Sequence, residues 1–170
     1  MQQFLDEIEG SVPALRRYAR ALTRDADRAD DLVQDCIERA IRKRGLWSPR
    51  GPLRAWLFKI LLNVYRNDLR SRRRRGGDQV PLDDLVVEPA IPAPQPGRIA
   101  LAEMARAVDE LPNEQREALL LVVLDGASYQ EAAGILGIPT GTLMSRLGRA
   151  RAALRTMTGT ADEPRLRTVK

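Results

Sequence analysis

The chain reads SYQEAAGILGIPTGTLMSRLGRARAALR over residues 128–155, a stretch that is typical of two helices joined by a tight turn. Ser128 and Glu131 form a capping box, in which each side chain satisfies an exposed amide at the start of a helix. Gly137 has no β-carbon and favours the left-handed turn that ends this helix. A second helix then begins near Thr140. The stretch therefore predicts a helix-turn-helix.

The second helix of this motif, Thr140 to Arg155, has two chemically different faces. Its inner face is apolar and carries Leu143, Leu147, Ala150 and Leu154. Its outer face carries hydroxyl and guanidinium groups, which suit the base edges and phosphates of duplex DNA. The candidate DNA-binding residues on and beside this face are Thr140, Thr142, Ser145, Arg146, Arg149 and Arg151. A plain helical hairpin is the alternative reading of this motif taken alone.

Helical periodicity also covers the N-terminal part of the chain, and strand-like alternation is absent. Apolar residues recur at steps of three and four over residues 5–22, 29–41 and 53–64. Asp25 is a candidate N-cap of the second of these helices, and Pro52 stands where a first-turn proline is tolerated at the start of the third. These segments predict a bundle of three helices.

A change of composition separates the two helical parts. Residues 76–97 contain five prolines, which no continuous helix or central strand accepts. Helical spacing resumes from Ile99 to Leu111 and again from Ala118, until Asp125-Gly126 closes that helix. We therefore expect an all-α fold of two small domains, residues 1–75 and 98–157, joined by a Pro-rich linker over 76–97 and followed by a tail over 158–170.

Charge is distributed in four alternating blocks. Residues 1–37 carry 5 basic and 8 acidic side chains, and residues 38–75 carry 13 basic and 2 acidic ones. Residues 78–131 carry 3 basic and 11 acidic side chains, whereas residues 140–170 carry 7 and 2. Basic blocks of this strength favour nucleic acid phosphates as partners, and acidic blocks suit a basic protein surface or plain solvent.

The most basic block also holds most of the aromatic side chains. Four of the seven aromatic residues, Trp47, Trp56, Phe58 and Tyr65, fall within it. Aromatic faces stack on unpaired bases while neighbouring cations hold the backbone, so this block is suited to single-stranded DNA. Trp56 lies on the apolar stripe, and we expect it, and in part Phe58, to belong to the core.

Composition also argues against several classes of protein. No apolar run approaches the roughly 20 residues that cross a bilayer, and nothing resembles a secretion signal, so membrane insertion is not expected. Cys36 is the single cysteine, which favours a reducing cytoplasm, and we expect it to be buried and inert. Without histidine, a cysteine cluster or a Gly-rich phosphate loop, we expect no catalytic residue, metal, other cofactor or small-molecule substrate.

Four motifs together resemble a known family. They are Asp30-Asp31-Leu32-Val33-Gln34-Asp35; Leu53-Arg54-Ala55-Trp56-Leu57-Phe58-Lys59-Ile60 with Asn63 and Asp68; Leu111-Pro112 with Gln115-Arg116; and Gly141-Thr142-Leu143-Met144-Ser145-Arg146-Leu147 with Arg149-Ala150-Arg151. In order and spacing they resemble the extracytoplasmic-function sigma factors of bacterial RNA polymerase, over about residues 5–75 and 100–156.

The resemblance implies a role for each segment in transcription initiation. The first domain corresponds to sigma region 2, whose second helix binds the clamp of core RNA polymerase, here through Asp30, Asp31, Gln34 and Asp35. Its third helix and the loop before it bind the minus-ten element and the melted non-template strand. The residues implied there are Trp47, Arg50, Arg54, Lys59, Asn63, Arg66, Arg70, Arg72 and Arg73.

By the same resemblance, the helix-turn-helix corresponds to sigma region 4 and reads the minus-thirty-five element of promoter DNA as duplex. Met144 and Gly148 stand where the family often has lysine and histidine, so the preferred promoter sequence is not implied. Family members are commonly silenced by an anti-sigma factor, which is a further expected partner.

Three alternatives remain open at this level. A stand-alone helix-turn-helix regulator explains only the second half of the chain and predicts tight DNA binding without polymerase. A nucleic-acid enzyme lacks the residues for catalysis. A helical adaptor between proteins predicts no contact with DNA.

Overall fold

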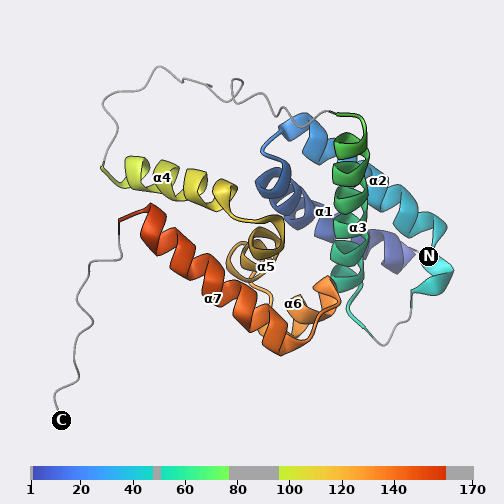
Figure 1. Cartoon of the computed structure of the whole chain (residues 1–170). Coiled ribbons are helices and arrows are strands. Elements are labelled where there is room, and N and C mark those ends of the chain that lie inside the picture. The colour runs from blue at the N-terminus through green and yellow to red at the C-terminus, as the bar shows by residue number, and fades with distance from the viewer. Residues whose placement is uncertain (1, 48–50, 77–95, 160–170) are drawn as a thin grey trace, which may run out of the picture.

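All regular structure in the described part of the chain is helical, which confirms the predicted all-α fold. The computed structural model describes residues 2–47, 51–76 and 96–159. Its helices are α1 (Gln2–Thr23), α2 (Ala26–Arg42), a 3₁₀ turn (Arg44–Leu46), α3 (Leu53–Arg74), α4 (Pro96–Glu110), α5 (Asn113–Val123), α6 (Tyr129–Leu136) and α7 (Thr140–Met157). We call α1–α3 the N-terminal module and α4–α7 the C-terminal module (Figure 1).

The N-terminal module is built from the three predicted helices, each of which buries most of its apolar stripe against the other two, although the end residues Leu5 and Ile41 are 38% and 44% exposed. Asp25 caps α2 as predicted, since its carboxylate accepts the Arg28 backbone amide at 3.0 Å. Leu15, Leu57 and Leu61 are fully buried at the centre of the module. Burial of one such side chain contributes about 1.5–3 kcal/mol, so the stripes supply the main cohesion of the module.

Cys36 lies in this core, as the sequence predicts. It is 0% exposed, and its thiol donates a hydrogen bond to the Leu57 carbonyl at 3.3 Å. Burial raises the pKa of the Cys36 thiol to about 12. The thiol is therefore protonated and shielded at neutral pH.

The C-terminal module contains the predicted helix-turn-helix. The Ser128 hydroxyl accepts the Glu131 amide at 3.2 Å, and the Glu131 carboxylate accepts the Ser128 amide at 2.9 Å, which completes the capping box at the start of α6. Gly137 ends α6 with a left-handed φ of 67°, and α7 begins at Thr140. The inner face of α7 is buried as expected, so the two-helix motif is confirmed.

Helix α4 departs in part from its predicted stripe. Ala107 and Leu111 are buried, but Ile99 and Leu101 are 47% and 71% exposed. The reason is geometric, because α4 packs mainly against α7 and its first half lies away from the N-terminal module, as Figure 1 shows. Only the second half of the stripe therefore joins the core.

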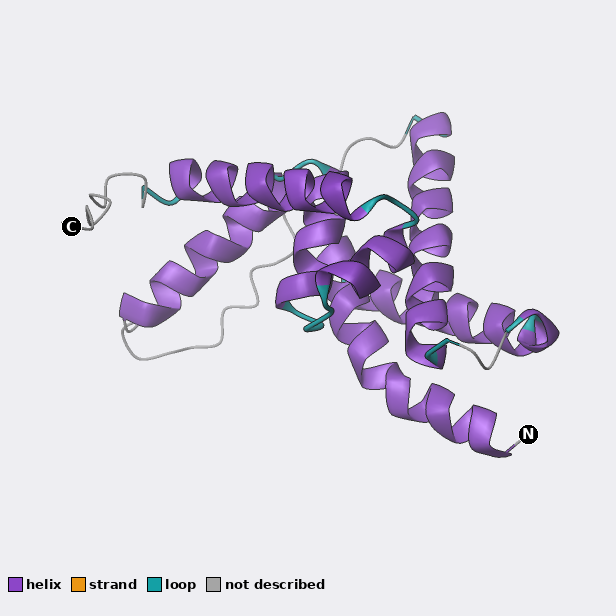
Figure 2. Ribbon diagram, turned by 90° about the horizontal axis from the view of Figure 1, so that it is seen from below, coloured by secondary structure: helices purple, strands orange, loops and turns teal. Residues whose placement is uncertain are grey.

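The two modules lie against each other. Helix α3 packs on α6, and α1 packs on α5, so the central helices α5 and α6 stand between α3 and the outer pair α4 and α7 in both views (Figures 1 and 2). Pro96 and Gly97, which the sequence assigns to the linker, form the first turn of α4. The rest of the predicted linker, apart from Gly76, and the tail beyond Gly159 lie outside the described residues.

Candidate nucleic-acid and protein interface

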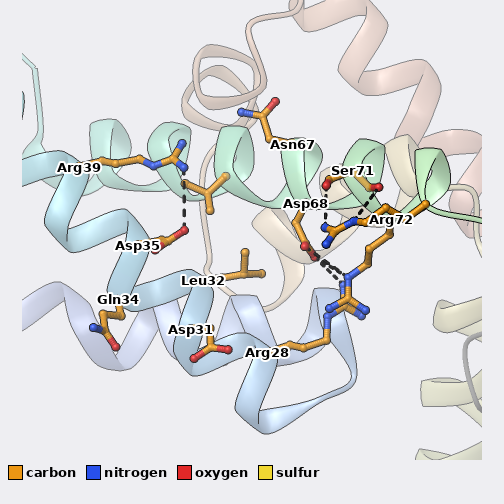
Figure 3. A pocket seen from close by; sticks show the side chains of 12 residues that line it. Arg28, Asp31, Leu32, Gln34, Asp35, Arg39, Asn67, Asp68, Ser71 and Arg72 are labelled. Atoms are coloured by element: carbon orange, nitrogen blue, oxygen red, sulfur yellow. Dashed lines mark hydrogen bonds and ion pairs between the residues drawn. The ribbon is translucent and has the colours of Figure 1, made fainter. Parts of the chain in front are cut away.

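The predicted acidic surface of α2 is divided between two faces. Asp31, Gln34 and Asp35 line a cleft at α2 and α3 that has a volume of about 540 Å³ (Figure 3). Their side chains are exposed, so they are open to a partner. Asp30 instead turns toward α1, where its carboxylate lies 3.2 Å from the Arg16 guanidinium. The structure therefore brings three of the four predicted residues together and separates Asp30 from them.

Asp68 of α3 lines the same cleft on the side opposite α2. Arg28 of α2 donates to this carboxylate at 2.8 Å, and Arg72, one turn further along α3, lies 3.1 Å from it (Figure 3). Burial alone would raise the pKa of Asp68, but the hydrogen bonds and charges of the two arginines outweigh it and lower the pKa. Asp68 thus fixes α2 against α3 and orients Arg72.

Helix α3 carries exposed basic side chains along its length, and one of them, Arg72, lies on the side that faces the cleft with α2. The predicted DNA-binding residues that are exposed on α3 are Arg54, Lys59, Asn63, Arg70, Arg72 and Arg73. The basic C-terminal end of the helix also complements the helix dipole, so its charge is favourable even without a ligand. Arg50, predicted to belong to the same surface, lies outside the described residues.

The aromatic side chains of this block are mostly structural. Phe58 is fully buried and Trp56 is partly buried against the core, as expected for both. Trp47, predicted to contact a base, is half-buried, and its ring centroid lies 5.8 Å from that of Phe4. Trp47 is therefore only partly available to an unpaired base.

Arg54 and Arg66, also predicted to bind DNA, are engaged by the C-terminal module. The Arg66 guanidinium makes two contacts with the Glu117 carboxylate, at 2.6 and 3.2 Å. Arg54 is hydrogen-bonded to Asp125, and its guanidinium also lies 5.6 Å from the centre of the Phe58 ring. The hydrogen bond to Glu117 is the main reason that the pKa of Arg66 is raised, so its charge is firmly retained.

Sequence reasoning missed the residues that join the two modules. Arg116 is 9% exposed and donates to the Tyr65 hydroxyl at 3.0 Å, while the Tyr18 hydroxyl donates to the Glu117 carbonyl at 3.0 Å. One signal was present, because Arg116-Glu117 stands directly before the apolar run 118–124 and buried charges require partners. The pattern could have shown that these side chains are paired, but not with which module.

The helix-turn-helix exposes most of its predicted DNA-binding residues. Thr140, Thr142, Ser145, Arg149 and Arg151 are exposed on α7. The Arg151 guanidinium donates to the Tyr129 hydroxyl at 3.1 Å, a contact that orients Arg151 toward the start of α6.

Arg146 differs from its expected outward position. Its side chain is 16% exposed and pairs with Glu114 of α5 at 3.1 Å, because α5 packs beside α7. It lines a cleft that also includes Arg66, Arg70 and Arg73 of α3. Arg146 is thus turned toward the N-terminal module.

The described residues also bear on two other features, a metal-binding group and a membrane-spanning helix. Within residues 2–47, 51–76 and 96–159, no group of three or more His, Cys, Asp or Glu side chains is placed to hold a metal ion. None of the described helices is both long enough and apolar enough to cross a membrane.

Two family models match the chain, one in each module. The Sigma2 domain of PhyR matches residues 8–62, and Sigma-70, region 4 matches residues 101–154. The first match lies within α1–α3, and the second covers the helix-turn-helix as far as Leu154, near the end of α7.

Individual relatives match over nearly the whole chain. The ECF RNA polymerase sigma factor EcfG of Rhodopseudomonas palustris is 43% identical over 88% of this chain and 81% of its own length. The sigma factor RpoE, in a co-crystal structure with the anti-sigma factor NepR from Bartonella quintana, is 36% identical, with a TM-score of 0.76 over 96% of this chain and 100% of that one. CnrH, solved in complex with the cytosolic domain of CnrY, is 29% identical, with a TM-score of 0.70 over 95% of this chain and 91% of that one.

Proposed function

The chain belongs to the extracytoplasmic-function family of RNA polymerase sigma factors, and on that premise we propose that it binds core RNA polymerase through α2 and promoter DNA through α3 and α7. The observation that carries this proposal is the separation of charge on the N-terminal module. The exposed α2 residues Asp31, Gln34 and Asp35 line the cleft that they share with Arg72, whereas the exposed cations Lys59, Arg70 and Arg73 of α3 line other clefts. One module can therefore hold a protein and a nucleic acid at the same time.

The polymerase surface in this proposal consists of Asp31, Gln34 and Asp35. All three are exposed and face the same cleft, as a docking surface requires. Asp30 is already paired with Arg16, so we assign it the role of orienting α2 against α1.

The DNA surface consists of two cationic helices on different modules. The exposed residues of α3 would bind the minus-ten element and its melted strand, and those of α7 the minus-thirty-five duplex. Each surface is small, so linked engagement on polymerase would give the pair an affinity that neither has alone. Free chain should accordingly bind promoter DNA weakly.

The test of the polymerase surface is the affinity of purified chain for core enzyme. The variant Asp31→Asn/Asp35→Asn should bind about fivefold to tenfold more weakly, mainly through slower association, because complementary charges steer encounter. The control Glu9→Gln/Asp27→Asn removes the same charge from exposed positions of the same module and should bind as the wild type does. Equal loss in both variants would mean that net charge, not this surface, determines binding.

We extend the proposal to regulation by an anti-sigma factor. Two relatives with the same fold were solved in complex with NepR and with the cytosolic domain of CnrY. Purified NepR of Bartonella quintana is a concrete probe, because the sigma factor in its complex is 36% identical to this chain. Addition of NepR should lower the transcription that this chain supports with core enzyme.

A further inference from the structure

We propose that two ion pairs, Arg66–Glu117 and Arg54–Asp125, hold the two modules together in a closed state of the chain. We call these two pairs the ionic latch. In this state the carboxylates of the C-terminal module engage the two arginines of α3. The inference rests on the proposed function, because these two arginines belong to the surface assigned to the minus-ten DNA. In the closed chain, the carboxylates of one DNA-binding module stand where phosphates would bind on the other.

The Arg66–Glu117 pair has the geometry of a strong contact. Two nitrogens of the Arg66 guanidinium meet the two oxygens of Glu117 at 2.6 and 3.2 Å, a bidentate arrangement that carboxylates and phosphates both accept. Glu117 is only 3% exposed, whereas the Arg66 side chain is 30% exposed. Phosphate can therefore replace the carboxylate only if the modules separate.

Asp125 engages Arg54 at the other end of the interface. The Asp125 side chain is 7% exposed, and the Arg54 side chain is 46% exposed. Arg54 and Arg66 both lie on α3, so the two contacts hold one helix at two points. A phosphate backbone that followed α3 would meet both carboxylates.

A third ion pair between the modules has the same arrangement of charge. Arg24, just after α1, lies 2.7 Å from Asp109 of α4, which again pairs an arginine of the N-terminal module with a carboxylate of the C-terminal module. The Tyr18 hydroxyl donates to the Glu117 carbonyl, and burial together with the Glu117 charge raises the pKa of Tyr18, so the hydroxyl stays protonated. Arginines of the N-terminal module and carboxylates of the C-terminal module thus neutralise each other across the interface.

The latch makes DNA binding and closure compete for the same guanidinium groups. A DNA ligand that binds only the open chain shifts the population toward it, and its apparent affinity is reduced by the fraction that is closed. Loss of the two carboxylate charges should therefore open the chain and raise its affinity for DNA. Replacement by amides keeps the size of the side chain and one acceptor oxygen but removes the charge and the second acceptor, so each pair is weakened with little change in packing.

The experiment compares Glu117→Gln/Asp125→Asn with the wild type in two measurements on the full chain. Small-angle X-ray scattering should show a radius of gyration larger by several ångström, on a base of about 16 Å for a compact chain of this length. Binding of a fluorescent single-stranded DNA of mixed sequence should tighten threefold to tenfold at constant salt. If the double variant unfolds, Asp125→Asn alone carries the same test with a smaller expected change.

The matched control is Glu103→Gln/Glu110→Gln. It removes two negative charges from exposed positions of α4 in the same module, and it should leave the radius of gyration unchanged and the DNA affinity within about twofold of the wild type. An unchanged radius of gyration in the latch variant, or an equal gain of DNA affinity in the control, would overturn the proposal. Scattering requires neither polymerase nor promoter, so its result is independent of whether the proposed function holds.

Discussion

The buried thiol of Cys36 gives a direct probe of whether the N-terminal module is packed as described. It is the single cysteine of the chain, so any thiol reagent reports on this position alone. The perturbation is addition of an excess of a chromogenic disulfide reagent to native protein at pH 8. We expect almost no reaction until the module unfolds.

The expected magnitude follows from the pKa and the burial. Because the pKa rises from 9.0 to about 12, the thiolate fraction at pH 8 falls roughly a thousandfold, and the thiolate is the reacting species. The side chain is also 0% exposed, so even this small fraction meets no reagent unless the helices open. Native Cys36 should therefore react at least a thousandfold more slowly than a free cysteine.

The assay follows the released chromophore with and without urea. In urea the reaction should be complete at the rate of an unfolded thiol, which provides the internal control. Stoichiometric labelling of native protein within tenfold of the free-cysteine rate would refute the packing of α2 against α3. It would also reopen a redox role for Cys36, which the buried position argues against.

Three further variants test single contacts. Asp68→Asn removes the carboxylate between α2 and α3 and should lower the free energy of unfolding by about 1 kcal/mol at pH 7, allowing for solvent screening. Folding lowers the pKa of Asp68, so the wild type should lose this advantage as pH falls below 3.8 and the variant should not, as urea unfolding at pH 7 and pH 3 would show. Ser128→Ala removes the cap of α6 and should cost about 1 kcal/mol, seen as a lower urea midpoint; an unchanged midpoint would contradict the capping role. Arg149→Ala should weaken binding of the polymerase complex to promoter duplex about fivefold to tenfold with an unchanged urea midpoint, and equal affinity would remove Arg149 from the interface.

Local patterns in the sequence predicted the helices and their caps because these depend on near neighbours. The Asp25 cap, the Ser128 capping box and the left-handed Gly137 are all found where the residue types place them. Apolar periodicity likewise predicted the buried faces of α1, α2, α3 and α7. The stripe of α4 was only half right, because burial there depends on how far the neighbouring helix reaches.

The contacts between the modules could not be predicted, because they join residues far apart in sequence. Tyr18 and Glu117 lie 99 positions apart, and Arg66 and Glu117 lie 51 apart. The charge blocks were interpreted as surfaces for nucleic acid, for another protein or for solvent, and they did not show which carboxylate meets which arginine. The acidic block 78–131, expected to meet a protein or solvent, in part meets the chain's own basic helix instead.

The central claim is that this chain directs core RNA polymerase to promoters, and transcription from genomic DNA tests it most directly. Purified chain and core enzyme would be incubated with genomic DNA and nucleotides, and the 5′ ends of the products would be sequenced. The account predicts discrete start sites that require both proteins and that share two sequence elements at constant spacing. Products that start at the same positions with core enzyme alone, or no association between the two proteins, would contradict it.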